Sequence, residues 1–571
     1  MGASGPIGPG IASPARAGAS RTWRDAALLR PIARLSGGTA REARWPHPAG
    51  TTSRRASGRS GLGWRTLDFL LVAFVAVVLR APSMSLSVFG SADESAFVLA
   101  GREVVLGNLP YLTFWDHKPL GSTLLIASAM AVFGQSLEAV RALGMACVIG
   151  TAWTLYLITR RFSQDRLVML AAALLYVAFS TRLAGGIATI TETILAPFTA
   201  TGVLLLFLAP GTRSSIGMAS SFAAAGLAFG IATWIKYVPA VPAALTGGVA
   251  LVAVLAQGKG RLALAIACGA VFAAGLLLPT VASIAAYWWL GVLDAFWRAN
   301  FGFMAQYATE AGFQDHPRGP LFYALRCTTL VVLDIWPLVL AAAAAFLPAC
   351  RGHLFGPGRS YRGTLLVAWL AGEMLAVTMQ MKFYMYHFLP LLPPLCALAA
   401  IAVRAHASRL ALPQKVGLVT VLAVAFITFG PIALHARAVA AALSRPDVPR
   451  EIAKLVAAEM RPGDRIFIAN SEPIIYFLGN APLPTRFAFP VLLTGPHMSV
   501  IPVDPRAEVR RILDEKPRFI VFNLSWRDAP VTWDAELMEL VEWIVSRDYV
   551  PHSTWTLADS MGTVRLFALR D

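Results

Sequence analysis

The sequence contains few charged residues and lacks the patterns that hold a structural metal or a disulfide framework. Charged side chains make up 14% of the 571 residues, whereas hydrophobic side chains make up 56%. The five cysteines lie in or beside apolar runs without CxxC spacing, which argues against a zinc site or paired disulfides. Alternating polar and apolar residues in ten-residue segments are also missing, which argues against a transmembrane barrel.

Apolar runs of about twenty residues recur instead, and each is long enough to cross a bilayer as a helix. The chain is therefore predicted to be a polytopic α-helical membrane protein with about 11–13 transmembrane helices. Residues 119–134 form a shorter embedded or re-entrant segment. We expect full spans at 66–82, 137–159, 166–182, 190–209, 217–235, 238–256, 261–289, 320–347, 363–380, 385–403 and 415–435.

Basic residues gather in the loops at one end of these spans. They are Arg160, Arg161, Arg166, Arg213, Lys259, Arg261, Arg351, Arg359, Arg362, Arg404, Arg409 and Lys415. Because lysine and arginine are enriched in cytoplasmic loops, this end and the N-terminus are predicted to be cytoplasmic. The net charge of +17 is then explained by topology and does not predict a nucleic-acid partner.

The two ends of the chain differ from the spans. Residues 1–65 hold eleven arginines against Asp25 and Glu42, which predicts a disordered basic cytoplasmic tail. A transit peptide or a misassigned start codon would give the same composition. Residues 437–571 are predicted to be a periplasmic soluble α/β domain, with either a docking or a purely structural role. Its expected helices are 451–460 and 507–516, and its expected strands are 465–470, 518–523 and 563–569.

One short stretch, SADESAFVLAGREVVLGNLPYLTFWDHKPLG (91–121), carries an unusual set of charges. Asp93 and Glu94 begin a predicted amphipathic helix over 93–106 that would lie on the outer interface. The sequence from Ser91 to Glu94 also fits a capping box, in which case these acids only stabilise the helix start. A second cluster, Asp116-His117-Lys118, stands directly before the next apolar run.

The order of these motifs resembles the GT-C glycosyltransferases of the protein O-mannosyltransferase and aminoarabinose transferase type, family 39 and its bacterial relatives. The resemblance rests on the acidic pair, GNLPY (107–111), WDHKP (115–119) and GQSLEAVR (134–141). It continues in GLAFGIATWIKYVPAVPAAL (226–245) and KFYMYHFLPLLPPLCALAA (382–400). Leu120 and Phe97 depart from the family, which usually has proline and tyrosine there.

The resemblance implies a GT-C transmembrane domain over 66–436, with an outer-face loop at 83–118. It also implies an inverting transfer of a sugar from a polyprenyl phosphate to a hydroxyl group of a lipid, polysaccharide or protein. Undecaprenyl phosphate is the expected carrier in a bacterial inner membrane. Asp93 would be the catalytic base. The expected substrate-binding residues are Glu94, Asp116, His117, Lys118, Arg182, Glu192, Lys236, Tyr237, Lys382, Tyr386 and His387.

Several alternatives stay open at this point. Glu192 could orient the sugar or could be an ordinary first-turn acid. The sequence indicates no definite cofactor, although Asp93, Asp116 and His117 could together bind a divalent metal. Asp334 and Glu373 lie inside predicted spans, where ionisable groups are costly, so a secondary transporter or lipid flippase that uses them is the alternative function. The sequence does not select the sugar or the acceptor.

Overall fold

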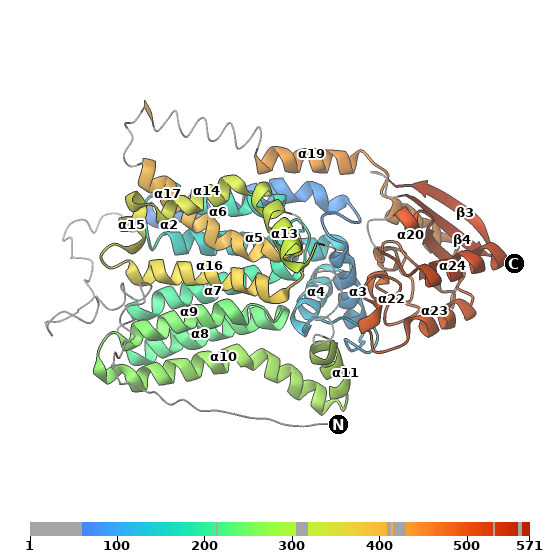
Figure 1. Ribbon diagram of the computed structural model, residues 1–571, viewed down its shortest axis with the longest axis horizontal. Helices are drawn as coiled ribbons and strands as arrows, with labels where there is room; N and C mark the ends of the chain where they lie inside the picture. Colours follow the sequence, from blue (N-terminus) through green and yellow to red (C-terminus); the bar gives the residue numbers. More distant parts are fainter. Residues whose placement is uncertain are drawn as a thin grey trace, which may run out of the picture.

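The computed structural model describes residues 60–571 except 184, 213, 304–317, 408–410, 412, 415–429, 529–531, 558–561 and 571. Figure 1 shows a bundle of long helices, with a smaller unit that contains the strands packed at one end. Almost all of the predicted basic tail lies outside the described residues, as do Arg213, Arg409 and Lys415.

Seven helical segments among the described residues are long and apolar enough to cross a membrane. They contain α2 (Ser60–Arg80), α5 (Leu137–Thr159), α7 (Thr191–Leu208), α8 (Ser215–Ile235), α10 (Leu262–Trp289), α16 (Ser360–Gln380), and η6 (Met385–Leu391) with α17 (Leu392–Ala407). The remaining predicted apolar segments form the shorter helices α4 (Leu120–Phe133), α6 (Arg166–Arg182) and α9 (Ala240–Leu255).

The predicted span 320–347 is not one straight helix. It consists of α13 (Pro320–Asp334) and α14 (Trp336–Ala343), which meet at Ile335 with a bend of 88°. Pro337 occupies the first turn of α14, where its missing N–H would have had no intrahelical partner, so the proline favours a new helix start. A short helix, α15 (Pro348–Phe355), then leads to α16.

Most of the predicted span 415–435 lies outside the described residues, and the chain is described again from Gly430. Helix α19 (Pro431–Leu443) follows and connects to the C-terminal unit. At the same end of the bundle, α10 is followed by α11 (Leu293–Trp297) and a π-helical turn, η4 (Arg298–Gly302).

The C-terminal unit is a four-stranded sheet with helices around it. Its strands are β1 (Ile466–Ile468), β2 (Phe519–Asn523), β3 (Tyr549–Thr556) and β4 (Thr563–Leu569), in the order β1-β2-β4-β3. The pair β1-β2 is parallel, whereas β4 is antiparallel to both of its neighbours. The accompanying helices are α20 (Val448–Glu459), α21 (Ile474–Leu478), α22 (Pro490–Leu493), α23 (Pro505–Asp514) and α24 (Ala535–Asp548). The predicted elements are all present, and β3, α21, α22 and α24 are additional.

Helix α3 (Asp93–Val105) lies between the membrane helices and the C-terminal unit (Figure 1). It is buried from Glu94 to Glu103, so the prediction of a helix lying on the outer interface is wrong. Arg102 donates from Nη1 to the carbonyl oxygens of Tyr476 and Ala481 at 3.0 Å each. The C-terminal unit therefore covers the face of α3 that an isolated interfacial helix would expose.

Candidate active site

The two acids at the start of α3 have different surroundings. Glu94 is 3% exposed, and its carboxylate accepts hydrogen bonds from Arg141 Nη2 at 2.8 Å and from the backbone N–H of Thr189 at 2.7 Å. The predicted capping box is not formed, because the N-cap is Ala92 and Glu94 is bound to α5 instead. Asp93 is partly exposed, and its carboxylate makes no hydrogen bond or ion pair with the described residues.

The loop that precedes α4 holds the second cluster against α3. Lys118 Nζ lies 3.8 Å from Asp116 Oδ1 and 4.6 Å from the centre of the Phe97 ring. The ring of His117 stacks on that of Phe303 with 4.6 Å between centroids. Tyr111 fixes the loop, since its hydroxyl donates to the carbonyl oxygen of Lys118 at 2.7 Å.

The charge of Lys118 is supported by acids from three parts of the chain. Burial lowers the pKa of this ammonium group, but Asp116, Asp93 and Glu192 together outweigh burial and raise the pKa above its usual value. Lys118 is therefore a cation near neutral pH. This influence also indicates that Asp93 and Glu192, predicted for the site from separate motifs, lie near the same lysine.

The pKa of the His117 imidazole is lowered in part by nearby cations. Its pKa lies well below the usual value because of burial and then because of Lys118, His497, Lys236 and Lys382. Three lysines of the predicted substrate-binding set thus act on one imidazole, although they come from distant parts of the chain. His117 stays neutral there near pH 7.

Lys236 and Glu192 form an ion pair at this end of the bundle. The distance from Lys236 Nζ to Glu192 Oε1 is 2.5 Å, and the other carboxylate oxygen accepts from the Thr191 hydroxyl at 2.8 Å. Gly121 permits the close approach of α4 to α8, because a Cβ there would lie 2.6 Å from the carbonyl oxygen of Trp234. This approach brings the loop ending at Pro119 beside Lys236.

A buried amide from the turn η4 connects two tyrosines of the site. Asn300 is 1% exposed, and its Oδ1 accepts from the hydroxyl of Tyr237 at 2.9 Å and from that of Tyr111 at 3.4 Å. Its Nδ2 donates to the carbonyl oxygen of Phe296 at 2.9 Å, which fixes the amide orientation. Asn300 was not predicted, because a single asparagine in a predicted loop carries no signal of burial.

Lys382 lies in a strained connection between two helices. The flanking residues Met381 and Phe383 have φ values of 55° and 48°, in the left-handed region that non-glycine residues rarely adopt. Lys382 and Tyr386 do not share a helical face, since the helical turn η6 begins only at Met385. Lys382 is 4% exposed, and such strain is typical of functional sites.

The other residues of the KFYMYH stretch lie close to the lysines. Lys236 Nζ is 5.9 Å from the centre of the Tyr386 ring, and the rings of Tyr386 and His387 meet edge-on with 4.8 Å between centroids. Gly185 allows this arrangement: its φ is +83°, and a Cβ there would lie 2.8 Å from Cβ of Tyr386.

The polar residues inside the predicted spans have partners of their own. Arg182 Nη2 forms an ion pair with Asp334 Oδ1 where α6 meets α13. Glu373 is buried in α16 and accepts a hydrogen bond from Trp369 Nε1 at 2.9 Å. These contacts give Asp334 and Glu373 local structural partners, and no ion pair or hydrogen bond links them to each other among the described residues.

The C-terminal unit also contributes to this end of the bundle. His497 Nε2 lies 3.4 Å from the hydroxyl oxygen of Tyr384, two residues beyond Lys382. The carbonyl oxygen of Arg486 accepts from the backbone N–H of Trp115 at 2.8 Å. His497 was not predicted, because a histidine in a turn of a separate domain has no sequence link to the membrane motifs.

The described residues contain no group of three His, Cys, Asp or Glu side chains that could hold a metal ion. Asp93, Asp116 and His117 therefore do not form such a group. A divalent metal remains an untested prediction for this chain.

Comparison with known proteins shows which family and which folds this chain resembles. Residues 117–288 match the family of dolichyl-phosphate-mannose-protein mannosyltransferases. A crystal structure of ArnT from Cupriavidus metallidurans bound to undecaprenyl phosphate matches with a TM-score of 0.55 at 14% identity, over 90% of this chain and 98% of that chain. The oligosaccharyltransferase of Archaeoglobus fulgidus in its apo form matches with a TM-score of 0.52 at 12% identity, over 89% of this chain and 74% of that chain. No curated protein sequence matches.

The chain is thus a membrane protein with the GT-C fold of these enzymes. The family match begins at His117 and includes Lys118, Glu192 and Lys236, three of the residues described above. The resemblance to family 39-type glycosyltransferases inferred from the sequence is confirmed.

Proposed function

We propose that this chain is an inverting glycosyltransferase that moves a sugar from a polyprenyl phosphate carrier to a hydroxyl acceptor. The GT-C fold and the family match over 117–288 support this reaction class. The bound undecaprenyl phosphate of the similar ArnT structure supports the same carrier here. The acceptor is a lipid, a polysaccharide or a protein.

The proposal rests on the surroundings of the Asp93 carboxylate. The other acids predicted for the site are engaged: Glu94 with Arg141, Asp116 with Lys118, and Glu192 with Lys236. Asp93 alone among these four has no partner in the described part of the chain. A hydroxyl group is a weak nucleophile until a base accepts its proton, so an unengaged carboxylate near the lysines suits that role.

The reaction then requires one bond to form and one to break. The acceptor oxygen bonds to the anomeric carbon and gives its proton to Asp93, while the bond from that carbon to the phosphate oxygen breaks. The polyprenyl phosphate leaves with the electron pair, and Lys118, Lys236 and Lys382 stabilise its charge. No general acid is needed for such an anionic leaving group.

This function sets an orientation in the membrane. We propose that the site and the C-terminal unit face the periplasm of a bacterial inner membrane and that the arginine-rich end faces the cytoplasm. In a cysteine-free background, a cysteine at exposed Ser546 should react with an impermeant thiol reagent from outside, and one at exposed Ser360 should not. Labelling of Ser360 alone would reverse the orientation.

The reaction can be tested with purified protein in detergent. The wild type should consume a polyprenyl-phosphate sugar and release polyprenyl phosphate when an acceptor is present. Asp93→Asn should fold normally and lose turnover by about 100-fold or more, the scale of general-base loss. Glu138→Gln is the matched control, because Glu138 is an exposed first-turn acid of α5 and should keep full turnover. Wild-type turnover in Asp93→Asn would exclude Asp93 as the base.

A further inference from the structure

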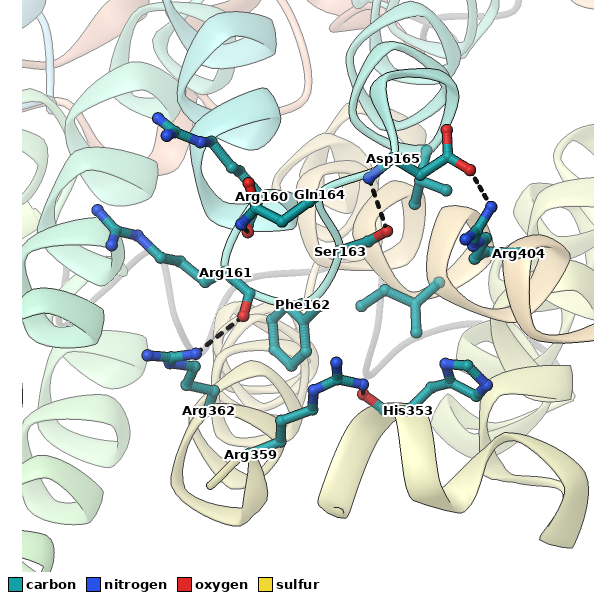
Figure 2. Close-up of a pocket in the computed structure, with 12 residues that line it drawn as sticks. Arg160, Arg161, Phe162, Ser163, Gln164, Asp165, His353, Arg359, Arg362 and Arg404 are labelled. Carbon is teal, nitrogen blue, oxygen red and sulfur yellow. Dashed lines mark hydrogen bonds and ion pairs between the residues drawn. The ribbon is translucent and has the colours of Figure 1, made fainter. Parts of the chain in front are cut away.

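A pocket with a volume of about 620 Å³ lies at the end of the bundle opposite to the candidate active site. Three segments enclose it: the α5–α6 loop, the chain from α15 into α16, and the end of α17. Figure 2 shows the basic side chains that line it, which are Arg160, Arg161, His353, Arg359, Arg362 and Arg404. The predicted gathering of basic loops at one end is thus seen for these segments.

Two acids at this end of the bundle are already paired with arginines. Asp165 forms an ion pair with Arg404, and Asp68 lies 2.6 Å from Arg166. The side chains of Arg160 and Arg161 form no hydrogen bond or ion pair with any residue that the structure describes. They therefore leave positive charge that these two carboxylates do not neutralise.

A third arginine adds to this unneutralised charge. Arg362 donates from Nη1 to the carbonyl oxygen of Arg161 at 2.9 Å. In Figure 2 the side chains of Arg160, Arg161 and Arg362 extend toward the same side. Burial, and then the like charges of Arg362 and Arg160, lower the pKa of Arg161. An anion bound among the three would relieve this repulsion.

The positive-inside bias accounts for arginines in these loops, but it requires neither a concave site nor the convergence of three segments. The pocket also has an apolar part formed by Phe162, Val168 and Ile401, all of which are buried. Guanidinium groups match phosphate oxygens in pairs of parallel hydrogen bonds. The lining therefore suits a phosphate group that is attached to an apolar or neutral remainder.

We propose that this pocket binds a phosphate-bearing anion through Arg160, Arg161 and Arg362. The phosphate could belong to the headgroup of an anionic lipid at the membrane surface or to a soluble phosphate compound. Basic pockets between membrane helices are known to hold lipid headgroups in this way.

The proposal can be tested by native mass spectrometry of the full chain released from micelles that contain phosphatidylglycerol. Wild type should retain the lipid, and Arg161→Gln should weaken retention by about tenfold, with a larger loss in the triple variant R160Q/R161Q/R362Q. Arg351→Gln is the matched control, since Arg351 is exposed on α15 outside the pocket and should retain the lipid normally.

Competition separates the two sources of phosphate. If inorganic pyrophosphate displaces the lipid from wild type, the pocket accepts soluble phosphate. If pyrophosphate has no effect, the pocket selects the lipid headgroup. Both outcomes support the proposal, provided that the arginine variants reduce binding. The proposal would be overturned if the triple variant bound the lipid and pyrophosphate as well as wild type does. It would also be overturned if Arg351→Gln lost as much lipid as Arg161→Gln. Melting temperatures of all variants verify that the fold is kept.

Discussion

The two ends of the helix bundle use charge in opposite ways. At the site end, Lys236, Arg141 and Arg182 each meet a carboxylate, and the C-terminal unit covers α3. At the arginine end, Arg160 and Arg161 meet no carboxylate among the described residues, and the pocket between the loops is lined by further arginines. The site end is built from neutralised pairs, whereas the arginine end retains net positive charge.

This difference indicates how each end could bind a ligand. A buried ion pair costs desolvation and holds its two members in a fixed geometry. At the site end, pairing leaves Asp93 as the predicted acid that has no partner among the described residues. At the other end the groups left over are arginines. The same reasoning thus assigns proton acceptance to one end and anion binding to the other.

The largest expected effect comes from breaking a pair at the site end. Arg141→Gln removes the cation beside buried Glu94, and we expect it to destabilise the protein by about 3–5 kcal/mol, the cost of an uncompensated buried charge. Arg161→Gln should change stability by less than about 0.5 kcal/mol, because no pair is lost. Thermal unfolding in detergent measures both. Adding Glu94→Gln to Arg141→Gln should recover part of the loss, and similar losses at the two ends would remove the contrast.

An intermediate effect is expected on donor binding. Lys382→Ala should weaken binding of the polyprenyl-phosphate sugar by about 1.5–3 kcal/mol, the contribution of a charge-assisted hydrogen bond, and Lys382→Arg should keep much of it. Isothermal titration with the donor and with the unphosphorylated polyprenol measures this. The polyprenol should bind both variants like wild type. If it loses affinity equally, Lys382 packs at the interface and the phosphate contact lies with Lys118 or Lys236.

The smallest effect concerns the contribution of the C-terminal unit to the site end. His497→Ala removes the contact with Tyr384 and should lower kcat/KM by about two- to tenfold, because one neutral hydrogen bond contributes about 0.5–1.5 kcal/mol. His552→Ala is a suitable control, since His552 pairs with Glu459 on the surface of the same unit, 2.9 Å away. Steady-state kinetics of the two variants decide the point. If both variants kept the kcat/KM of wild type, the C-terminal unit would have only a structural role.

Sequence patterns predicted the local elements well. Apolar runs located the membrane helices because length and hydrophobicity determine them, and short apolar runs located β1, β2 and β4. The break at Ile335 was missed, although Pro337 marked it, because the apolar composition continues on both sides. Lys118 and Lys236 could be predicted as site residues because they lie in the sequence motifs that carry the family resemblance.

Contacts between residues far apart in the chain could not be predicted from the sequence. Nothing in the spacing shows that Glu94 meets Arg141 rather than a capping N–H, since the two are separated by 47 residues. The amphipathic pattern of α3 correctly indicated a helix, but the C-terminal unit that covers it lies far along the chain. Asn300 and His497 acquire their positions only through tertiary packing, so a single sequence gives no reason to single them out.

The anchoring of α3 by Arg102 has a consequence for biosynthesis. Tyr476, whose carbonyl oxygen accepts from Arg102, is 374 residues further along the chain. At a translation rate of about 5–20 residues per second, the ribosome reaches it about 20 to 75 s after α3 has been made. Throughout that interval the helix that carries Asp93 lacks its cover. A nascent chain therefore completes the packing of α3 only after most of the chain has been translated.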